Sequence, residues 1–346
     1  MDLSVNVGYF APHITSDHKL IKELDNLGVS CIWTAEAYGY DAATPLAYFS
    51  AITSNIELGT GIMQIPARTP AMAAMTAVTL DKLSNGRFRL GLGVSGPQVV
   101  EGWHGIAYGK PLVKTREYIS IVRDILRREG KTTFEGEYYK LPYTGEDSSN
   151  LGKPLKLIEP PLRKEIPIYL AAIGPKNIEL SAEIADGWLP FMYSPTKGDK
   201  IFNTHLQKGF EKSGVSNKKD AFNIVATVFA KICDEEEKES FLKPARSTFA
   251  LYIGGMGARN KNFYFNLACE YGYEEIASNV QDLYLSGKKQ EAEDLLPNEL
   301  IEDLTLVGTK KDIAKKLESW QNSNVTELSL STPIDIDTIK FIKEIL

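Results

Sequence analysis

The chain has 346 residues, of which 43% are hydrophobic and 24% are charged. This composition is typical of a globular protein with a substantial core and excludes the disordered and fibrous classes. The net charge of −6 argues against a nucleic-acid partner, because binding to a phosphate backbone requires a concentrated basic surface. We therefore expect a small-molecule partner.

The three cysteines, Cys31, Cys233 and Cys269, are widely spaced and form no Cys-x-x-Cys pair. Neither a disulfide framework nor a metal site is predicted, and a reducing cytoplasm is the expected location. The sequence starts Met1-Asp2-Leu3-Ser4, without a basic segment followed by an apolar one, and it contains no apolar run of about 18 residues. We expect neither export nor a membrane span.

The first half of the chain alternates strand patterns with helix patterns. Apolar runs predict strands at residues 3–8, 31–35, 56–61 and 87–94. Helices are predicted from a cap at Ser16 or Asp17 to Leu27, at 45–54, in an Ala- and Met-rich segment that ends near Gly86, and at 115–128. We expect the Ala- and Met-rich helix to be buried. Repeated strand–helix units of this kind predict a parallel sheet.

The second half contains two interruptions. Residues 130–165 break the alternation and include a predicted hairpin at 132–139. Strands are then predicted at 167–172, 188–192 and 222–232, with helices that begin at Pro175 and near Thr196. Residues 234–304 are predicted to be mainly helical, with a glycine-rich interruption before Phe263-Tyr264-Phe265, and are interpreted as a candidate lid. A capping box at Thr309 and Asp312, an eighth strand at 326–331 and a final helix complete the pattern.

Eight strands that are mostly separated by helices predict an α/β fold, a (β/α)8 TIM barrel that forms one domain over residues 1–346. The segments at about 130–165 and 234–304 are insertions after the fourth and seventh strands. In such barrels the chemistry lies on the loops that follow the C-terminal ends of the strands. These loops are therefore where we expect the functional residues.

The fifth predicted strand leads into a turn, Ile173-Gly174-Pro175-Lys176-Asn177. We expect Gly174 to adopt backbone angles that other residues avoid, and Pro175 suits the first position of a helix. The next amides then point outward and favour a phosphate, so the turn is a candidate anion site. The alternative is an ordinary connection between a strand and a helix.

A second glycine pattern, Gly91-Leu92-Gly93-Val94-Ser95-Gly96, matches the dinucleotide-binding fingerprint and follows a predicted strand. The fingerprint requires a long helix that begins at its third glycine. Pro97, Gly102 and Gly105 oppose such a helix, so NAD binding is not predicted.

Several segments resemble the luciferase-like monooxygenase superfamily. Residues 79–94, TLDKLSNGRFRLGLGV, resemble its signature from the third helix to the fourth strand. Four further segments are most similar to the branch that uses a deazaflavin, the branch of methylenetetrahydromethanopterin reductase-like proteins: Trp33–Asp41, Gly59–Ile62, Leu170–Lys176 and Ala185–Trp188. The resemblance extends over nearly the whole chain.

This resemblance implies a homodimeric barrel that uses coenzyme F420 for hydride transfer to or from a small organic substrate. The cofactor's phosphate is then expected at the turn formed by Ala172, Ile173, Gly174, Pro175, Lys176 and Asn177. A non-prolyl cis peptide is expected beneath the ring, between Gly61 and Ile62. The alternatives are a monooxygenase that uses reduced FMN and a non-catalytic flavin-binding barrel. Relatives act on methylenetetrahydromethanopterin, sugar phosphates or secondary alcohols, and nothing in the sequence selects among these.

Candidate catalytic residues come from the same comparison and from the loop positions. Glu36 matches a position where several deazaflavin enzymes have an aspartate that contacts the cofactor, and a buried carboxyl group there is a candidate proton carrier. The alternative is that Glu36 binds loop amides or a nearby arginine. Those enzymes often place histidine next, but this chain has Ala37, which leaves the general acid open. Tyr38 and His104 are the other candidates, and His13 is also predicted to be near the pocket.

Overall fold

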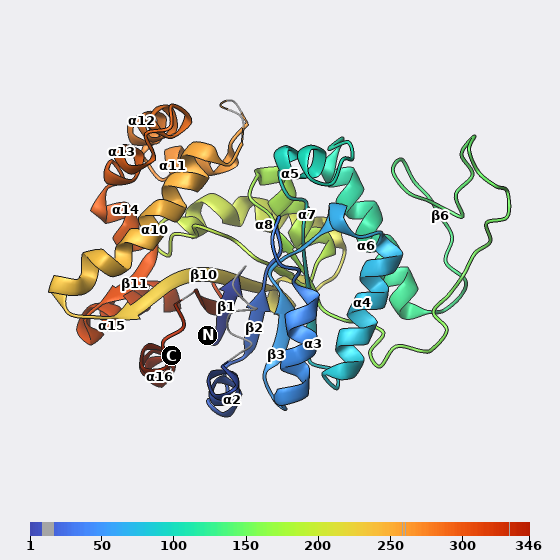
Figure 1. Ribbon diagram of the computed structural model, residues 1–346, viewed down its shortest axis with the longest axis horizontal. Coiled ribbons are helices and arrows are strands. Elements are labelled where there is room, and N and C mark those ends of the chain that lie inside the picture. Colours follow the sequence, from blue (N-terminus) through green and yellow to red (C-terminus); the bar gives the residue numbers. More distant parts are fainter. Residues whose placement is uncertain (9–16, 258, 260, 332) are drawn as a thin grey trace.

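The computed structural model describes residues 1–8, 17–257, 259, 261–331 and 333–346 (Figure 1). Within these residues, eight parallel strands form the barrel: β1 (Asp2–Gly8), β2 (Cys31–Thr34), β3 (Glu57–Thr60), β5 (Phe88–Gly93), β8 (Ile168–Ala171), β9 (Gly187–Trp188), β10 (Asn223–Ile232) and β12 (Glu327–Ser331). Each pairs with the next in this order, and β12 pairs with β1, so the ring is closed. The predicted (β/α)8 barrel is confirmed.

The principal helices outside the insertions follow the barrel strands: α2 (His18–Asn26), α3 (Ala43–Ile52), α4 (Pro70–Leu83), α6 (Pro111–Arg127), α7 (Pro175–Ile184), α8 (Gly198–Ser213), α15 (Lys310–Gln321) and α16 (Ile336–Ile345). The predicted local signals are present. The Asp17 side chain accepts from the Leu20 amide and caps α2, which is followed by Gly28 with φ +68°. Thr309 and Asp312 form the capping box of α15.

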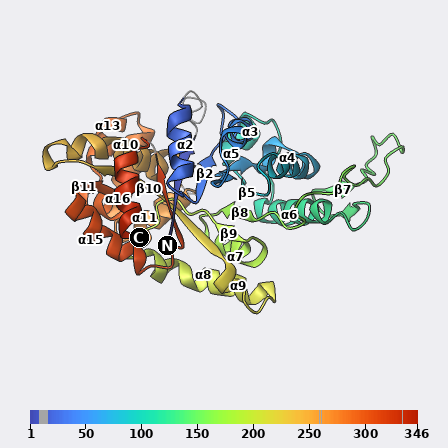
Figure 2. The same cartoon turned by 90° about the horizontal axis from the view of Figure 1, so that it is seen from below.

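The two insertions lie on different sides of the barrel. After α6, β6 (Phe134–Glu135) and β7 (Lys140–Leu141) form an antiparallel hairpin in an arm that projects from the body (Figures 1 and 2). The second insertion is helical and lies on the side away from this arm (Figure 1). It contains α10 (Glu235–Gly255), α11 (Phe263–Glu270), α12 (Glu274–Leu285), α13 (Lys289–Asp294) and α14 (Asn298–Asp303). Both insertions occur where they were predicted.

Two strand predictions need correction. A further strand, β11 (Thr305–Gly308), pairs with β10 outside the barrel ring, at Phe229–Ile232. Four residues are too few for periodicity to separate a buried strand from a helix, so the sequence did not reveal it. The sixth barrel strand was predicted at 188–192 but contains only Gly187 and Trp188. The chain leaves the sheet soon afterwards, and Met192 has φ +59°.

The prediction that the Ala- and Met-rich helix α4 is buried is wrong for one of its faces. Ala73, Ala74 and Ala77 face the core, but Met72 and Met75 are 49% and 51% exposed. In the first half of the helix alanine and methionine are both apolar, so polarity does not distinguish the two faces there; only Thr79 and Lys82, in the second half, mark the outer face.

A buried ion-pair cluster fills the N-terminal end of the barrel. Arg89 lies between two carboxylates: its guanidinium is 2.7 Å from Glu327 and also pairs with Glu57. Trp33 donates to Glu327 at 3.1 Å, and the Arg89 guanidinium carbon is 5.7 Å from the ring centroids of Trp33 and Tyr169. Burial by itself lowers the pKa of Arg89, but the acidic groups around it outweigh this effect and raise the pKa. A charged arginine therefore cross-links β3, β5 and β12.

Replacing Glu327 by glutamine tests this cluster. Glu327→Gln is expected to lower the free energy of unfolding by about 3 kcal/mol, because it leaves a buried guanidinium with one carboxylate partner fewer. The matched control is Glu57→Gln. The Glu57 side chain is 33% exposed against 2% for Glu327, so water can replace the carboxylate. The control is expected to lower the free energy of unfolding, measured by urea denaturation, by about 1 kcal/mol or less. Equal losses for the two variants would contradict this interpretation.

Candidate active site

Small residues line one side of the barrel mouth. In a strand, alternate residues face the same side. Trp33 of β2 faces the interior, since a Cβ atom placed on Gly59 would lie 2.3 Å from its ring. Ala35 and Gly61, two residues after Trp33 and Gly59, therefore lie on the same side at the C-terminal mouth. Gly93 lies there at the end of β5. A Cβ atom on Gly93 would lie 2.8 Å from the Ile62 side chain, so this glycine makes room for Ile62 at the mouth.

The peptide bond between Gly61 and Ile62 is cis, as the family resemblance implied. It separates β3 from β4 (Met63–Gln64), which pairs with β5. The Gly61 amide donates to the Thr34 carbonyl at 2.6 Å, and the Ile62 carbonyl accepts from the Glu36 amide at 3.1 Å. The backbone of residues 61–62 is therefore bonded to the end of β2 on both sides of the cis bond. We call residues 61–64 the bulge.

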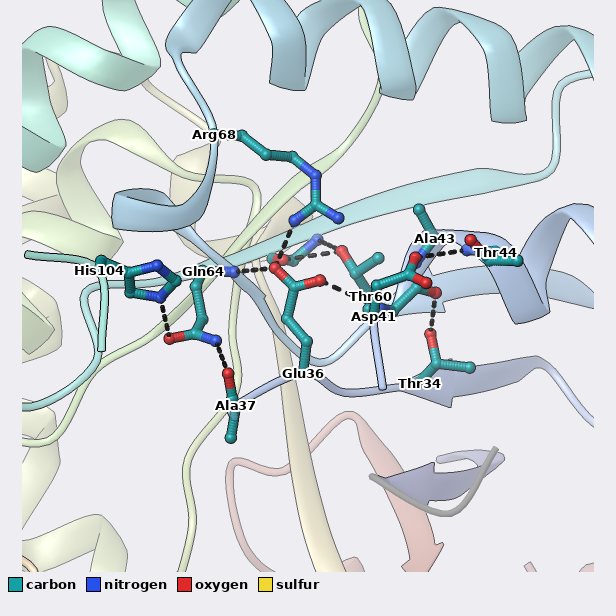
Figure 3. A network of polar contacts seen from close by, with 12 residues as sticks. Thr34, Glu36, Ala37, Asp41, Ala43, Thr44, Thr60, Gln64, Arg68 and His104 are labelled. Carbon is teal, nitrogen blue, oxygen red and sulfur yellow. Dashed lines mark hydrogen bonds and ion pairs between the residues drawn. The ribbon is translucent and has the colours of Figure 1, made fainter. Parts of the chain in front are cut away.

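The Glu36 side chain also holds the bulge. It is only 6% exposed. One carboxylate oxygen accepts from the Gln64 amide at 2.9 Å and from the Arg68 guanidinium, and the other accepts from the Ala42 amide at 3.0 Å (Figure 3). Because all three partners are donors, both oxygens act as acceptors. Glu36 is thus bound to loop amides and to an arginine, which is the alternative role that the sequence analysis gave it.

Gln64 links this network to His104, although the sequence did not single it out. Its side-chain amide nitrogen donates to the Ala37 carbonyl at 2.5 Å, and its oxygen is 3.3 Å from His104 Nε2 (Figure 3). Since that oxygen only accepts, a hydrogen on Nε2 of His104 completes this contact and leaves Nδ1 outside it. The position of Gln64 two residues after the expected cis bond is the signal that could have found it.

Tyr38 is not part of this network. Its side chain is 69% exposed in the loop between β2 and α3, so the structure does not bring it together with Glu36 and His104. His13 lies outside the described residues. Of the sequence candidates with catalytic roles, Glu36 and His104 are therefore the two that meet, through Gln64.

The turn after β8 has the predicted proline at the first position of α7, but the expected role of its glycine is wrong. Gly174 is the N-cap with φ −74° and ψ 151°, angles that any residue adopts. Glycine is required for space, since a Cβ atom at this position would lie 2.7 Å from the ring of Phe263. Ala172 and Ile173 precede the turn, and the Ala172 carbonyl accepts from Trp188 Nε1 at 2.8 Å.

This turn retains the features of an anion site. Among the described residues, the Lys176 amide has no acceptor, whereas the Asn177 amide donates to the Gly174 carbonyl at 2.9 Å. The Lys176 side chain is 74% exposed, and its ammonium group is 3.2 Å from Glu179. A helix N-terminus with an available amide and a nearby cation favours a negatively charged ligand.

The second glycine pattern serves the packing of strands. A Cβ atom on Gly91 would lie 1.8 Å from the Thr60 carbonyl oxygen, so the two strands approach closely at that point. Gly96 precedes α5 (Pro97–Gly102), a helix of six residues, which is shorter than a dinucleotide fold requires. The described residues contain no group of three or more potential metal ligands. None of their helices combines the length and apolar character needed to cross a bilayer.

The fold and the site together define a class of protein. A closed parallel barrel with a polar network and an open helix N-terminus at the C-terminal ends of its strands is the architecture of TIM-barrel enzymes.

The chain belongs to the luciferase-like monooxygenase family, whose model matches residues 5–327. It is 43% identical over 327 residues to a Mycobacterium tuberculosis protein assigned as a coenzyme F420-dependent oxidoreductase, covering 94% of this chain and 93% of the relative. It is 27% identical over 331 residues to the 5,10-methylenetetrahydromethanopterin reductase of Archaeoglobus fulgidus, covering 93% and 91%. The solved coenzyme F420-dependent tetrahydromethanopterin reductase of Methanopyrus kandleri shares the fold, with a TM-score of 0.77 and 23% identity over 99% of this chain and 97% of that one.

Proposed function

We propose that the protein is an oxidoreductase that transfers a hydride between coenzyme F420 and a small organic substrate. The observation that carries the proposal is the 43% identity, over 94% of the chain, to a relative assigned as dependent on this coenzyme. The open N-terminus of α7 supports it. We further propose that the protein works in a reducing cytoplasm, where its cysteines remain the free thiols that the structure contains.

The residues at the mouth fit a planar cofactor with a charged tail. We place the cofactor ring over the bulge, beside the small residues Ala35, Gly61 and Gly93. The Lys176 amide and ammonium group, with the N-terminus of α7, bind the tail phosphate in this proposal. When bound, the deazaflavin supplies or accepts the hydride. The protein positions the ring, excludes water and provides a proton carrier.

The two candidate catalytic residues have different roles in this proposal. Glu36 positions the bulge, because its carboxylate is already bound to three donors. His104 holds or releases a proton at Nδ1, while Gln64 fixes the hydrogen on Nε2. Tyr38 is exposed in its loop, and we assign it no catalytic role.

Cofactor choice is tested by titrating the purified protein with coenzyme F420 and with FMN. We expect F420 to bind at least about tenfold more tightly than FMN. The variant Lys176→Gln is expected to bind F420 about tenfold more weakly, because it loses a charged contact with the phosphate. The same variant is expected to leave binding of a deazaflavin without the phosphate tail unchanged. The matched control is Lys311→Gln, an exposed lysine in the first turn of α15.

Two outcomes of this titration would contradict the proposal. Tight FMN binding with oxygen consumption in the presence of substrate would support a monooxygenase. Tight F420 binding without a turnover-dependent absorbance change across a broad substrate screen would support a non-catalytic barrel.

The roles of Glu36 and His104 are separated by two glutamine variants. His104→Gln is expected to lower kcat by about a hundredfold while F420 affinity changes less than about twofold, because a proton carrier is lost and the fold is kept. Glu36→Gln is expected to lower the free energy of unfolding by about 2 kcal/mol, since it removes the buried charge that pairs with the partly buried guanidinium of Arg68. Steady-state kinetics and urea denaturation measure the two effects. Normal turnover in His104→Gln would remove it from the mechanism.

A homodimer is the proposed assembly. Apolar side chains remain exposed on α4, at Met72 and Met75, and in the arm, where Leu151, Leu155 and Ile158 are 85%, 67% and 91% exposed. Exposed apolar surface of this kind is typical of interfaces between proteins. Light scattering is expected to give the mass of two chains, and Ile158→Asp is expected to shift it toward one. A mass of one chain for the unmodified protein would contradict this assembly.

A further inference from the structure

A cluster of aromatic rings lies across the mouth from the bulge. In the ring of strands, β10 is opposite β3. Val225 of β10 packs inside the barrel with Trp33 and Tyr169, and Phe229, four residues further along, faces the same side at the mouth. Phe191 follows the neighbouring strand β9 and is also only partly buried. Bulky rings therefore face the small residues of β2, β3 and β5.

Helices of the second insertion complete this cluster. The Phe191 ring centroid is 4.5 Å from that of Tyr252 and 6.1 Å from that of Tyr264. The Tyr252 and Tyr264 centroids are 4.7 Å apart, with perpendicular planes. Phe249 lies behind them, 5.9 Å from Phe229 and 6.0 Å from Phe191. We call these five residues, Phe191, Phe229, Phe249, Tyr252 and Tyr264, the aromatic wall.

The wall extends to the proposed cofactor site through the first turn of α11. Phe263 lies against Gly174 at the start of α7, and the next residue, Tyr264, lies beside Phe191. The start of α11 therefore stands over the ends of both β8 and β9. Phe263 is 50% exposed, so its ring has a face available to a ligand.

A buried asparagine fixes this arrangement. Asn262, 2% exposed, donates to the carbonyls of Tyr252 and Ile253 at 2.9 and 2.8 Å. Its side-chain oxygen accepts from the amides of Tyr264 and Phe265 at 2.9 and 3.1 Å. The end of α10 and the start of α11 are thereby joined, and both tyrosines of the wall are held in place without a ligand.

Four cations near the mouth are already bound by the protein. The basic residues nearest to the ends of β3, β8, β9 and β10 each have a partner: Arg68 pairs with Glu36, Lys176 with Glu179, Lys197 donates to the Tyr271 carbonyl, and Lys231 pairs with Asp335. In sequence, residues 9–16, 258, 260 and 332 include no lysine or arginine. A phosphate or carboxylate placed against the rings of the wall would lose water and would have to draw one of these cations from its partner or reach the exposed Lys261 before α11, which is costly.

We propose that the aromatic wall binds the substrate and selects an uncharged, planar molecule, such as an aromatic or conjugated carbonyl compound. This inference rests on the proposed function, because the wall faces the bulge above which the cofactor ring is placed. A flat apolar molecule between the two gains contact area and ring stacking from Phe191 and Tyr252. Phosphorylated and carboxylated compounds are disfavoured.

A matched pair of probes tests the charge preference. The protein is loaded with coenzyme F420 and titrated by calorimetry with 4-phenylbut-3-en-2-one and with its para-carboxylate, which differ in one charged group. We expect the neutral ketone to bind at least about tenfold more tightly. Equal or tighter binding of the carboxylate, or no binding of the ketone up to millimolar concentration, would overturn the inference.

Variants of Phe191 test the wall itself. Phe191→Ala is expected to weaken binding of the ketone by about tenfold and to change F420 affinity by less than about twofold, because the ring contacts the substrate and not the cofactor tail. Phe191→Leu keeps an apolar side chain for folding and is also expected to weaken binding of the ketone. Tyr143→Ala, an exposed aromatic residue of the arm, is the control.

Folded Phe191 variants that bind the ketone as tightly as the unmodified protein would show that the wall serves only to fasten the insertion to the barrel. Failure of the unmodified protein to bind F420 is a different result. It contradicts the proposed function, and the ketone and carboxylate are then compared on protein loaded with FMN, which decides the substrate class separately.

Discussion

The hydrogen bonds of one buried carboxylate, Glu36, hold the part of the mouth on which the proposed cofactor site depends. Strand pairing is interrupted at Gly61 and Ile62, so the backbone beyond them needs acceptors that the sheet does not supply. Glu36 accepts from the Gln64 amide and from Arg68, and its own amide donates to the Ile62 carbonyl. A single side chain thus joins the end of β2 to the bulge. Gln64 carries the same connection on to His104.

The two sides of the mouth differ in a way that fits two flat molecules facing each other. Small residues of β2, β3 and β5 lie on the side of the bulge, whereas Phe191 follows β9 and Phe229 lies in β10 on the other side. The second insertion adds rings to the aromatic side only and reaches Gly174 through Phe263. The fold therefore brings the proposed sites for the cofactor ring, the phosphate and the substrate into one space.

Much of this fold was predictable because its signals are local. Periodicity located most of the barrel strands and the two insertions, and caps such as Thr309 with Asp312 marked helix starts. The misses also have local causes. β11 has four residues and no periodicity of its own, and α4 has methionines on its outer face that do not differ in polarity from its inner alanines. Gly174 was correctly noticed, but its role depends on Phe263, which is 89 positions later and whose contact no local pattern shows.

The sequence by itself determined where most barrel strands lie along the chain, the position of Glu36 just after a strand and the proline-led start of α7. These features follow from residue types and spacing within a few positions of one another. Only the tertiary structure decided that Arg89 lies between Glu57 and Glu327, that Gln64 joins Glu36 to His104, and that α11 completes an aromatic wall beside Phe191. Each of these contacts joins different strands, loops or helices. Their formation depends on which strands become neighbours in the closed barrel and on which way each side chain points, and neither is encoded in local spacing.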